Sequence, residues 1–324
     1  MEWTADVAAG DWLRARIDDP WRGTMHDTVP RGFAAYARVL HPASRERPVG
    51  RAWPVEGDAA AWEAFTADRP EIDGEAVTWA TTAAAFGTVM HPLAQWQRLV
   101  RSGDPYGDGI APRDADGWRY DAPADGDLEP ETLAVLAGIL TRHTTTPDDG
   151  CLALWEGWGG IVGGTGYGPS RYALDAGPDA DPRHEAFLAH SVRDVFNEVF
   201  RRPTWQPGIL SDDISRGPRF ALPQREYVLF RGGVSELADP AWGRNAPWRD
   251  PERGLHGFDR FVHSPNLVWP ADRAWVMATD IDLNATIVAG TAELVDAIAA
   301  DSRLEAARIP AGAVIGWTSD EVNA

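Results

Sequence analysis

Two aspartates near the end of a predicted strand are the first residues whose spacing suggests chemistry. The residue pattern predicts a strand from Arg273 to Asp282, and a period of two places Asp280 and Asp282 on one face of it. Two carboxylates at that spacing can coordinate a cation or divide the roles of acid and base. Aspartates beside a turn residue such as Asn284 more often accept backbone hydrogen bonds, and we favour that interpretation. Both remain ligand-binding candidates.

A segment punctuated by prolines, His263 to Asp272, leads into the same strand. It carries His263, Asn266 and Trp269. Polar side chains on a stiff loop beside a sheet edge often contact ligands, although hydrogen bonds that stabilise the loop are the commoner use of such residues. We predict these three residues as ligand-binding, with the loop-stabilising role as the alternative.

A glycine-rich run follows a predicted buried strand over residues 151–156, which is the context that phosphate-binding loops require. The run over residues 157–168 contains neither the dinucleotide spacing nor the P-loop pattern, and no convincing helix follows it. A turned connection is the favoured interpretation, and a loop that covers a ligand is the alternative. Trp155, Glu156 and Trp158 stand at this junction and are ligand-binding candidates. A cleft would be lined by Trp155, Trp158 and Trp269 together with Asp280 or Asp282.

Composition excludes several classes of enzyme. Inspection of the sequence finds no lysine, so Schiff-base, P-loop and kinase-type lysines are absent. The single cysteine, Cys151, allows neither an internal disulfide nor a cysteine zinc site, and its apolar strand predicts an inert thiol. The nucleophile elbow and the histidine zinc motif are also missing. We predict no catalytic residue, no metal site and no cofactor from motifs.

Charge narrows the range of partners. The formal net charge of −19 repels nucleic acid and anionic membranes and favours encounter with a basic protein. No signal peptide and no long apolar run are evident, so we expect a cytoplasmic protein with no membrane segment. The 16 tryptophans are spread along the chain, which favours core filling over an aromatic binding surface.

Periodicity and turn residues predict the elements that would position these side chains. Strands are expected over 32–40, 151–156, 226–230, 273–282 and 285–290, and helices over 59–68, 92–100, 130–142, 182–200 and 292–301. The fold class predicted from this pattern is α+β, with a mixed or mostly antiparallel sheet flanked by helices. We expect a single large domain over 1–324, or two closely packed lobes, with an irregular acidic stretch at 102–129.

Three blocks of the sequence carry a resemblance. They span residues 32–42, 154–159 and 265–282, and they resemble recurring blocks of uncharacterised proteins from actinobacteria. The resemblance implies kinship and no activity. Two functions stay open: an acidic binding or regulatory protein that acts on a basic protein partner, or an enzyme or small-ligand binder with a cleft lined by tryptophan and aspartate.

Overall fold

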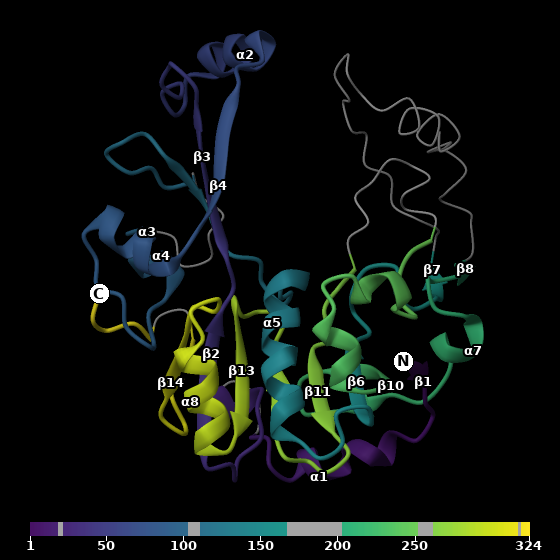
Figure 1. Ribbon diagram of the computed structural model, residues 1–324. Coiled ribbons are helices and arrows are strands. Elements are labelled where there is room, and N and C mark those ends of the chain that lie inside the picture. Colours follow the sequence, from purple (N-terminus) through teal and green to yellow (C-terminus); the bar gives the residue numbers. More distant parts are fainter. Residues whose placement is uncertain (19–21, 103–110, 167–202, 252–261, 317–318) are drawn as a thin grey trace.

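A large antiparallel sheet organises the part of the chain that the structure describes. The computed structural model describes residues 1–18, 22–102, 111–166, 203–251, 262–316 and 319–324 (Figure 1). Within them a nine-stranded sheet has the order β1-β10-β6-β11-β12-β13-β2-β14, with β9 paired to β10. Its strands are β1 (Glu2–Trp3), β2 (Ala35–Leu40), β6 (Gly150–Trp155), β9 (Phe220–Ala221), β10 (Glu226–Arg231), β11 (Leu267–Pro270), β12 (Val276–Ala278), β13 (Ala285–Gly290) and β14 (Ala306–Ile309). Every pair in this sheet is antiparallel, so the α+β class with a mostly antiparallel sheet is confirmed.

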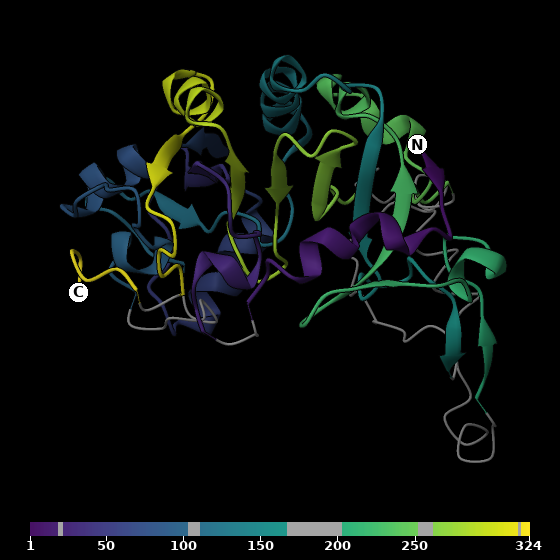
Figure 2. The ribbon, with the colours of Figure 1, turned by 90° about the horizontal axis from the view of Figure 1, so that it is seen from below.

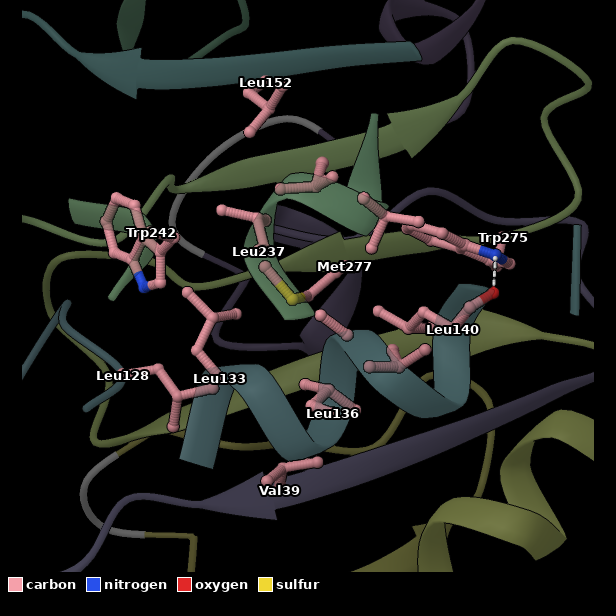
Figure 3. Packing of buried hydrophobic residues seen from close by; sticks show 14 of the residues in the cluster. Val39, Leu128, Leu133, Leu136, Leu140, Leu152, Leu237, Trp242, Trp275 and Met277 are labelled. Atoms are coloured by element: carbon pink, nitrogen blue, oxygen red, sulfur yellow. Dashed lines mark hydrogen bonds between the residues drawn. The ribbon is translucent and has the colours of Figure 1, made fainter. Parts of the chain in front are cut away.

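Two helices cover one face of this sheet. Figure 2 shows α5 (Pro130–Leu140) and α8 (Ala292–Ala300) on the same side of the strands. A leucine stripe gives α5 its apolar face, and Pro130 stands at the first turn, where its missing N–H costs nothing. Leu136 and Leu140 belong to the same buried cluster as Met277 of β12, as Figure 3 shows. The indole N–H of Trp275 donates to the carbonyl of Leu140 at 3.2 Å, which joins the far end of α5 to the sheet.

The opposite face of the sheet is buried beneath the N-terminal segment. Leu13 of α1 (Asp11–Arg14) and Met25 of the 3-10 helix η2 (Met25–Asp27) pack with Tyr36, Leu229 and Ile287 from three strands. A strand covered on both sides needs apolar residues in succession and not in alternation. The runs in β10 and β13 have this composition, which is why the sequence pattern identified them.

A second, three-stranded sheet forms an arm. It has the order β4-β3-β5, and β3 (Ala43–Pro48) pairs with β4 (Ile72–Val77) and β5 (Arg119–Asp121). Figure 1 shows the β3–β4 hairpin projecting from the large sheet with α2 (Ala59–Asp68) at its far end. No residue of α2 is buried. At the base of the arm, α3 (Trp79–Phe86) and α4 (Trp96–Leu99) form a separate aromatic core.

Most predicted elements agree with the structure, and two are shorter than predicted. The helices at 59–68, 130–142 and 292–301 and the strands at 151–156, 226–230 and 285–290 are confirmed within one or two residues at each end. The strand predicted over 32–40 is also present, but it begins three residues later, at Ala35. The helix predicted over 92–100 is only α4, because Gln95 has extended backbone angles. The strand predicted over 273–282 is only β12. The helix predicted over 182–200 lies outside the described residues.

The remaining elements are short. They are α7 (Asp212–Ser215), the two-stranded sheet of β7 (Gly164–Gly166) and β8 (Thr204–Gln206), and the 3-10 helices Val7–Gly10, Thr141–His143, Val234–Ala238 and Trp242–Asn245. Part of the predicted glycine-rich connection at 157–168 is thus a strand. Among the described residues, no helix is both long and apolar enough to cross a membrane.

Candidate functional site

One end of the large sheet gathers most of the predicted site residues. In the strand register, Leu267 of β11 lies between Ala153 of β6 and Ala278 of β12. The residues just beyond these three therefore meet at the same edge of the sheet. Asn266 shows this directly, because its backbone bonds both neighbours: its N–H donates to Ala153 and its carbonyl accepts from Thr279.

The Asn266 side chain is the centre of this edge. Its Oδ1 accepts the backbone N–H of Trp155 at 2.8 Å and the indole N–H of Trp158 at 3.3 Å. Its Nδ2 donates to the Thr279 carbonyl at 3.0 Å. Only 2 % of Asn266 is exposed, and its amide is engaged on both sides. Asn266 therefore holds together three segments at this end of the sheet: Trp155 to Trp158, His263 to Asn266, and Thr279 to Asp282. We call these segments the site edge. This is the loop-stabilising role that the sequence left open for Asn266.

Trp158 joins this amide to a histidine–aspartate pair. Its ring stacks on the His263 ring with centroids 3.9 Å apart and 13° between the planes, and it meets Trp155 edge-on at 5.5 Å. His263 Nδ1 lies 2.7 Å from Asp127 Oδ2, and the other Asp127 oxygen accepts the Ser264 N–H at 2.8 Å. A carboxylate on Nδ1 fixes the orientation of the imidazole ring.

Asp127 is a functional candidate that sequence reasoning missed. It lies in the acidic stretch at 102–129, which was predicted to be irregular, and nothing near it in sequence points to His263, 136 positions later. The only local feature is its position, because Asp127 lies three residues before Pro130, the proline that begins α5.

Asp280 and Asp282 do not share a strand face, which corrects the sequence prediction. Strand β12 ends at Ala278, and both aspartates lie in the turn that leads to β13. The Asp282 N–H donates to Asp280 Oδ1 at 3.0 Å, a turn-stabilising bond of the kind favoured from sequence. Beyond Ala278 the Thr279 N–H still donates to the Asn266 carbonyl, whereas the Thr279 carbonyl accepts from the Asn266 side chain and not from a strand backbone.

Arg225 neutralises part of this acidic turn. Its Nη2 lies 3.5 Å from Asp280 Oδ1 and also donates to Asp282 Oδ2. The guanidinium carbon lies 5.6 Å from the centroid of the Trp155 ring, so Arg225 separates the aspartates from the tryptophan. Burial raises the pKa of Asp280, while the Asp282 N–H and Arg225 act in the opposite direction. Burial and the neighbouring Asp282 charge also raise the pKa of Asp125.

A pocket of about 450 Å³ opens beside this turn. Its carboxylates are Asp27, Asp280 and Asp282, and its apolar wall includes Leu283 and Ile315. Backbone bonds position the Asp27 side: Met25 N–H donates to Ala313, Ile315 N–H donates to Gly23, and Gly23 N–H donates to Asp27 Oδ2 at 2.8 Å. None of the described residues that line this pocket is a tryptophan. The pocket therefore contains the two aspartates of the predicted cleft but not the tryptophans.

Two of the predicted site residues, Trp269 and Glu156, contact parts of the chain away from Asn266. Trp269 pairs with Cys151 at the opposite end of β11, is 2 % exposed and packs with Phe220, so the structure does not bring it to Asn266. Glu156 accepts from Arg219 Nε at 2.7 Å, and Arg219 in turn donates to the Ile214, Ser215 and Gly217 carbonyls. Glu156 therefore fixes the segment after α7 to the end of β6.

The described part of the chain offers few side chains that could bind a metal ion or act as a reactive thiol. No group of three or more histidine, cysteine, aspartate or glutamate side chains is arranged there to hold a metal ion. Burial raises the pKa of Cys151 to about 11, which keeps its sulfur protonated at neutral pH.

Gly126 allows the loop that carries Asp125 and Asp127 to approach the β12–β13 turn. Its φ is +74°, and a Cβ there would lie 2.7 Å from Ile281 Cα and 3.0 Å from the Trp158 ring. Gly312 has a nearly equal φ of +77° with nothing within 4 Å of that Cβ position. We expect Gly312→Ala to cost about 1 kcal/mol for the left-handed backbone, and Gly126→Ala to cost about 2 kcal/mol more for the backbone contact. Urea denaturation of both variants measures the difference, and equal losses would contradict the close approach.

Comparisons of the sequence with models of protein families, with curated proteins and with solved structures found no match, so the residues of the site edge carry the functional argument.

Proposed function

We propose that the protein binds a small cationic organic molecule, an amine or guanidine with an apolar body, in the pocket beside the β12–β13 turn. The observation that carries this proposal is the concentration of carboxylates: Asp27, Asp280 and Asp282 line the pocket, and Arg225 is the cation that pairs with two of them. Leu283 and Ile315 supply an apolar wall for the body of the ligand. A volume of about 450 Å³ is typical of small-molecule sites.

Charge balance supports a cation over an anion. Asp125 lies close enough to Asp282 for the two charges to interact, which adds a further carboxylate to this region. A positive ligand head relieves repulsion between these groups, whereas a negative head increases it. Because burial raises the pKa of Asp280, we expect affinity for a cation to fall as the pH is lowered, beginning above the range in which an ordinary aspartate protonates.

Calorimetric titration with phenethylamine, agmatine and phenylacetate tests this proposal at pH 7.5. Phenethylamine and phenylacetate have similar apolar bodies and opposite charges, so the sign of the ligand charge is the variable. We expect at least one of the amines to bind and phenylacetate to leave this pocket empty. Asp27→Asn should weaken amine binding about tenfold, the equivalent of about 1.4 kcal/mol.

Asp296→Asn is the matched control. It removes the same charge from an exposed position on α8, where Asp296 pairs with Arg308. Amine affinity should stay within about twofold of the unsubstituted protein. The proposal is wrong if neither amine binds, or if Asp27→Asn and Asp296→Asn change the affinity equally.

A basic protein partner is the function favoured from sequence, where the small-ligand binder is the alternative. It rests on the net charge of −19, which favours encounter with cations of every size. We rank it below the small ligand because a pocket selects by shape as well as by charge. A partner that competes with the amine and loses affinity in Asp27→Asn would show instead that a basic side chain of a protein enters the pocket.

A further inference from the structure

A second pocket, of about 740 Å³, lies where α5 begins. Pro130 and Glu131 of the first turn of α5 line one side, and Pro240 to Arg244, Arg249 and Val262 line the rest. Val262 directly precedes His263, so this pocket adjoins the site edge. The lining residues differ completely from those of the pocket beside the β12–β13 turn.

The charged side chains of this second pocket are mainly arginines. Arg244 and Arg249 both line it, and within the described residues neither guanidinium has a carboxylate in ion-pair range. The hydrogen bond between them, from Arg249 Nη1 to the Arg244 carbonyl at 3.3 Å, holds the two residues together without neutralising either. Most arginines near the other site residues pair with a carboxylate, as Arg219 and Arg225 do.

Uncharged donors are also left without acceptors here. Trp242 is 3 % exposed and lines the pocket, and its buried Nε1 has no hydrogen-bond partner. Figure 3 shows Trp242 near Leu128 and Leu133, at the end where α5 begins. No side chain caps that first turn, and because Pro130 has no N–H, the backbone N–H groups of Glu131 and Thr132 are the ones without a partner inside the helix. Buried indole N–H groups of Trp3, Trp12 and Trp53 also have no partner among the described residues, so the Trp242 N–H supports a ligand site here only together with the two arginines.

Together these donors select for negative charge. Among the described residues that line the pocket, the two arginines outnumber Glu131, the one acidic residue there, in a chain whose formal net charge is −19. Arginine forks and an uncapped helix N-terminus both bind carboxylate and phosphate oxygens. Pro240, Ala241 and Val262 provide an apolar wall. We infer that this pocket binds a small organic anion, whose carboxylate or phosphate group is held by Arg244 and Arg249 beside the first turn of α5.

The test titrates phenyl phosphate and phenylacetate into the full-length protein by calorimetry, with phenethylamine as the ligand of opposite charge. We expect at least one of the anions to bind. The double substitution Arg244→Gln with Arg249→Gln should weaken its affinity at least tenfold. Both arginines lie at the surface of the pocket, and circular dichroism and the urea midpoint establish that the variant stays folded.

The matched control is Arg303→Gln with Arg308→Gln, which removes the same charge from exposed positions near α8 and in β14. This variant should bind the anion within about twofold of the unsubstituted protein. Equal losses in the two double variants, or the absence of binding by both anions, would overturn the inference. Asp27→Asn separates the two pockets, because it should weaken amine binding and leave anion affinity unchanged.

Discussion

Trp79→Ala should lower the free energy of unfolding by about 3–5 kcal/mol, the range for removing a large aromatic side chain from a core. Trp79 is fully buried at the base of the arm, where its ring meets Trp96 edge-on at 5.5 Å. Its indole N–H donates to the His41 carbonyl at 2.9 Å, and the Arg38 guanidinium lies over its ring. The substitution therefore creates a cavity and also leaves a buried carbonyl without its donor.

Trp62→Ala is the control for this prediction. Trp62 belongs to α2, in which no residue is buried, and it packs with Trp53 and Phe65 at the far end of the arm. The same change of side chain should cost no more than about 1.5 kcal/mol there, since only part of the indole leaves water on folding. Urea denaturation gives both values. Similar losses would mean that the core at the base of the arm stabilises the fold no more than the arm tip does.

The local elements of the fold were predictable because they depend on near neighbours in sequence. Val228 to Phe230 and Ile287 to Ala289 are apolar in succession, which indicates strands covered on both faces. The order of the strands was not predictable. Strand β6 pairs with β10 and β11, which follow it by more than 70 residues, and no turn residue specifies a partner at that separation.

The candidate site was predictable only where strand ends mark it. Trp155, Asn266 and Asp280 each lie at a change from apolar to polar residues, and antiparallel pairing brings these changes to one edge. Trp269 lies three positions after Asn266, about 10 Å along a strand, and that separation should have excluded it from the same site. Asp27 and Arg225 reach the site edge only through tertiary contacts, so no local pattern identifies them.

Acidification should destabilise the protein through His41. The His41 ring is 1 % exposed, with Nδ1 2.6 Å from the Ala124 carbonyl and Nε2 3.0 Å from Thr286 Oγ1. Burial lowers its pKa from 6.5 to about 4. The unfolded chain therefore takes up a proton on His41 between pH 6.5 and 4, while the folded chain does not, and the unfolded state gains stability in that window.

The size of this effect follows from the shift. A difference of 2.5 pH units between 6.5 and about 4 corresponds to about 3 kcal/mol of stability lost between pH 7 and pH 4. His41→Gln removes the titrating ring, so its unfolding free energy should fall about 3 kcal/mol less than that of the unsubstituted protein over the same range. Urea denaturation at half-unit steps of pH measures the two slopes.

A second variant separates titration from the loss of hydrogen bonds. Thr279 Oγ1 and Thr286 Oγ1 are 2.7 Å apart, so Thr279→Val breaks the network that surrounds His41 and keeps the imidazole. That variant should be less stable at pH 7 and yet show the full decline toward pH 4. A His41→Gln slope equal to that of the unsubstituted protein would place the acid-sensitive group elsewhere in the chain.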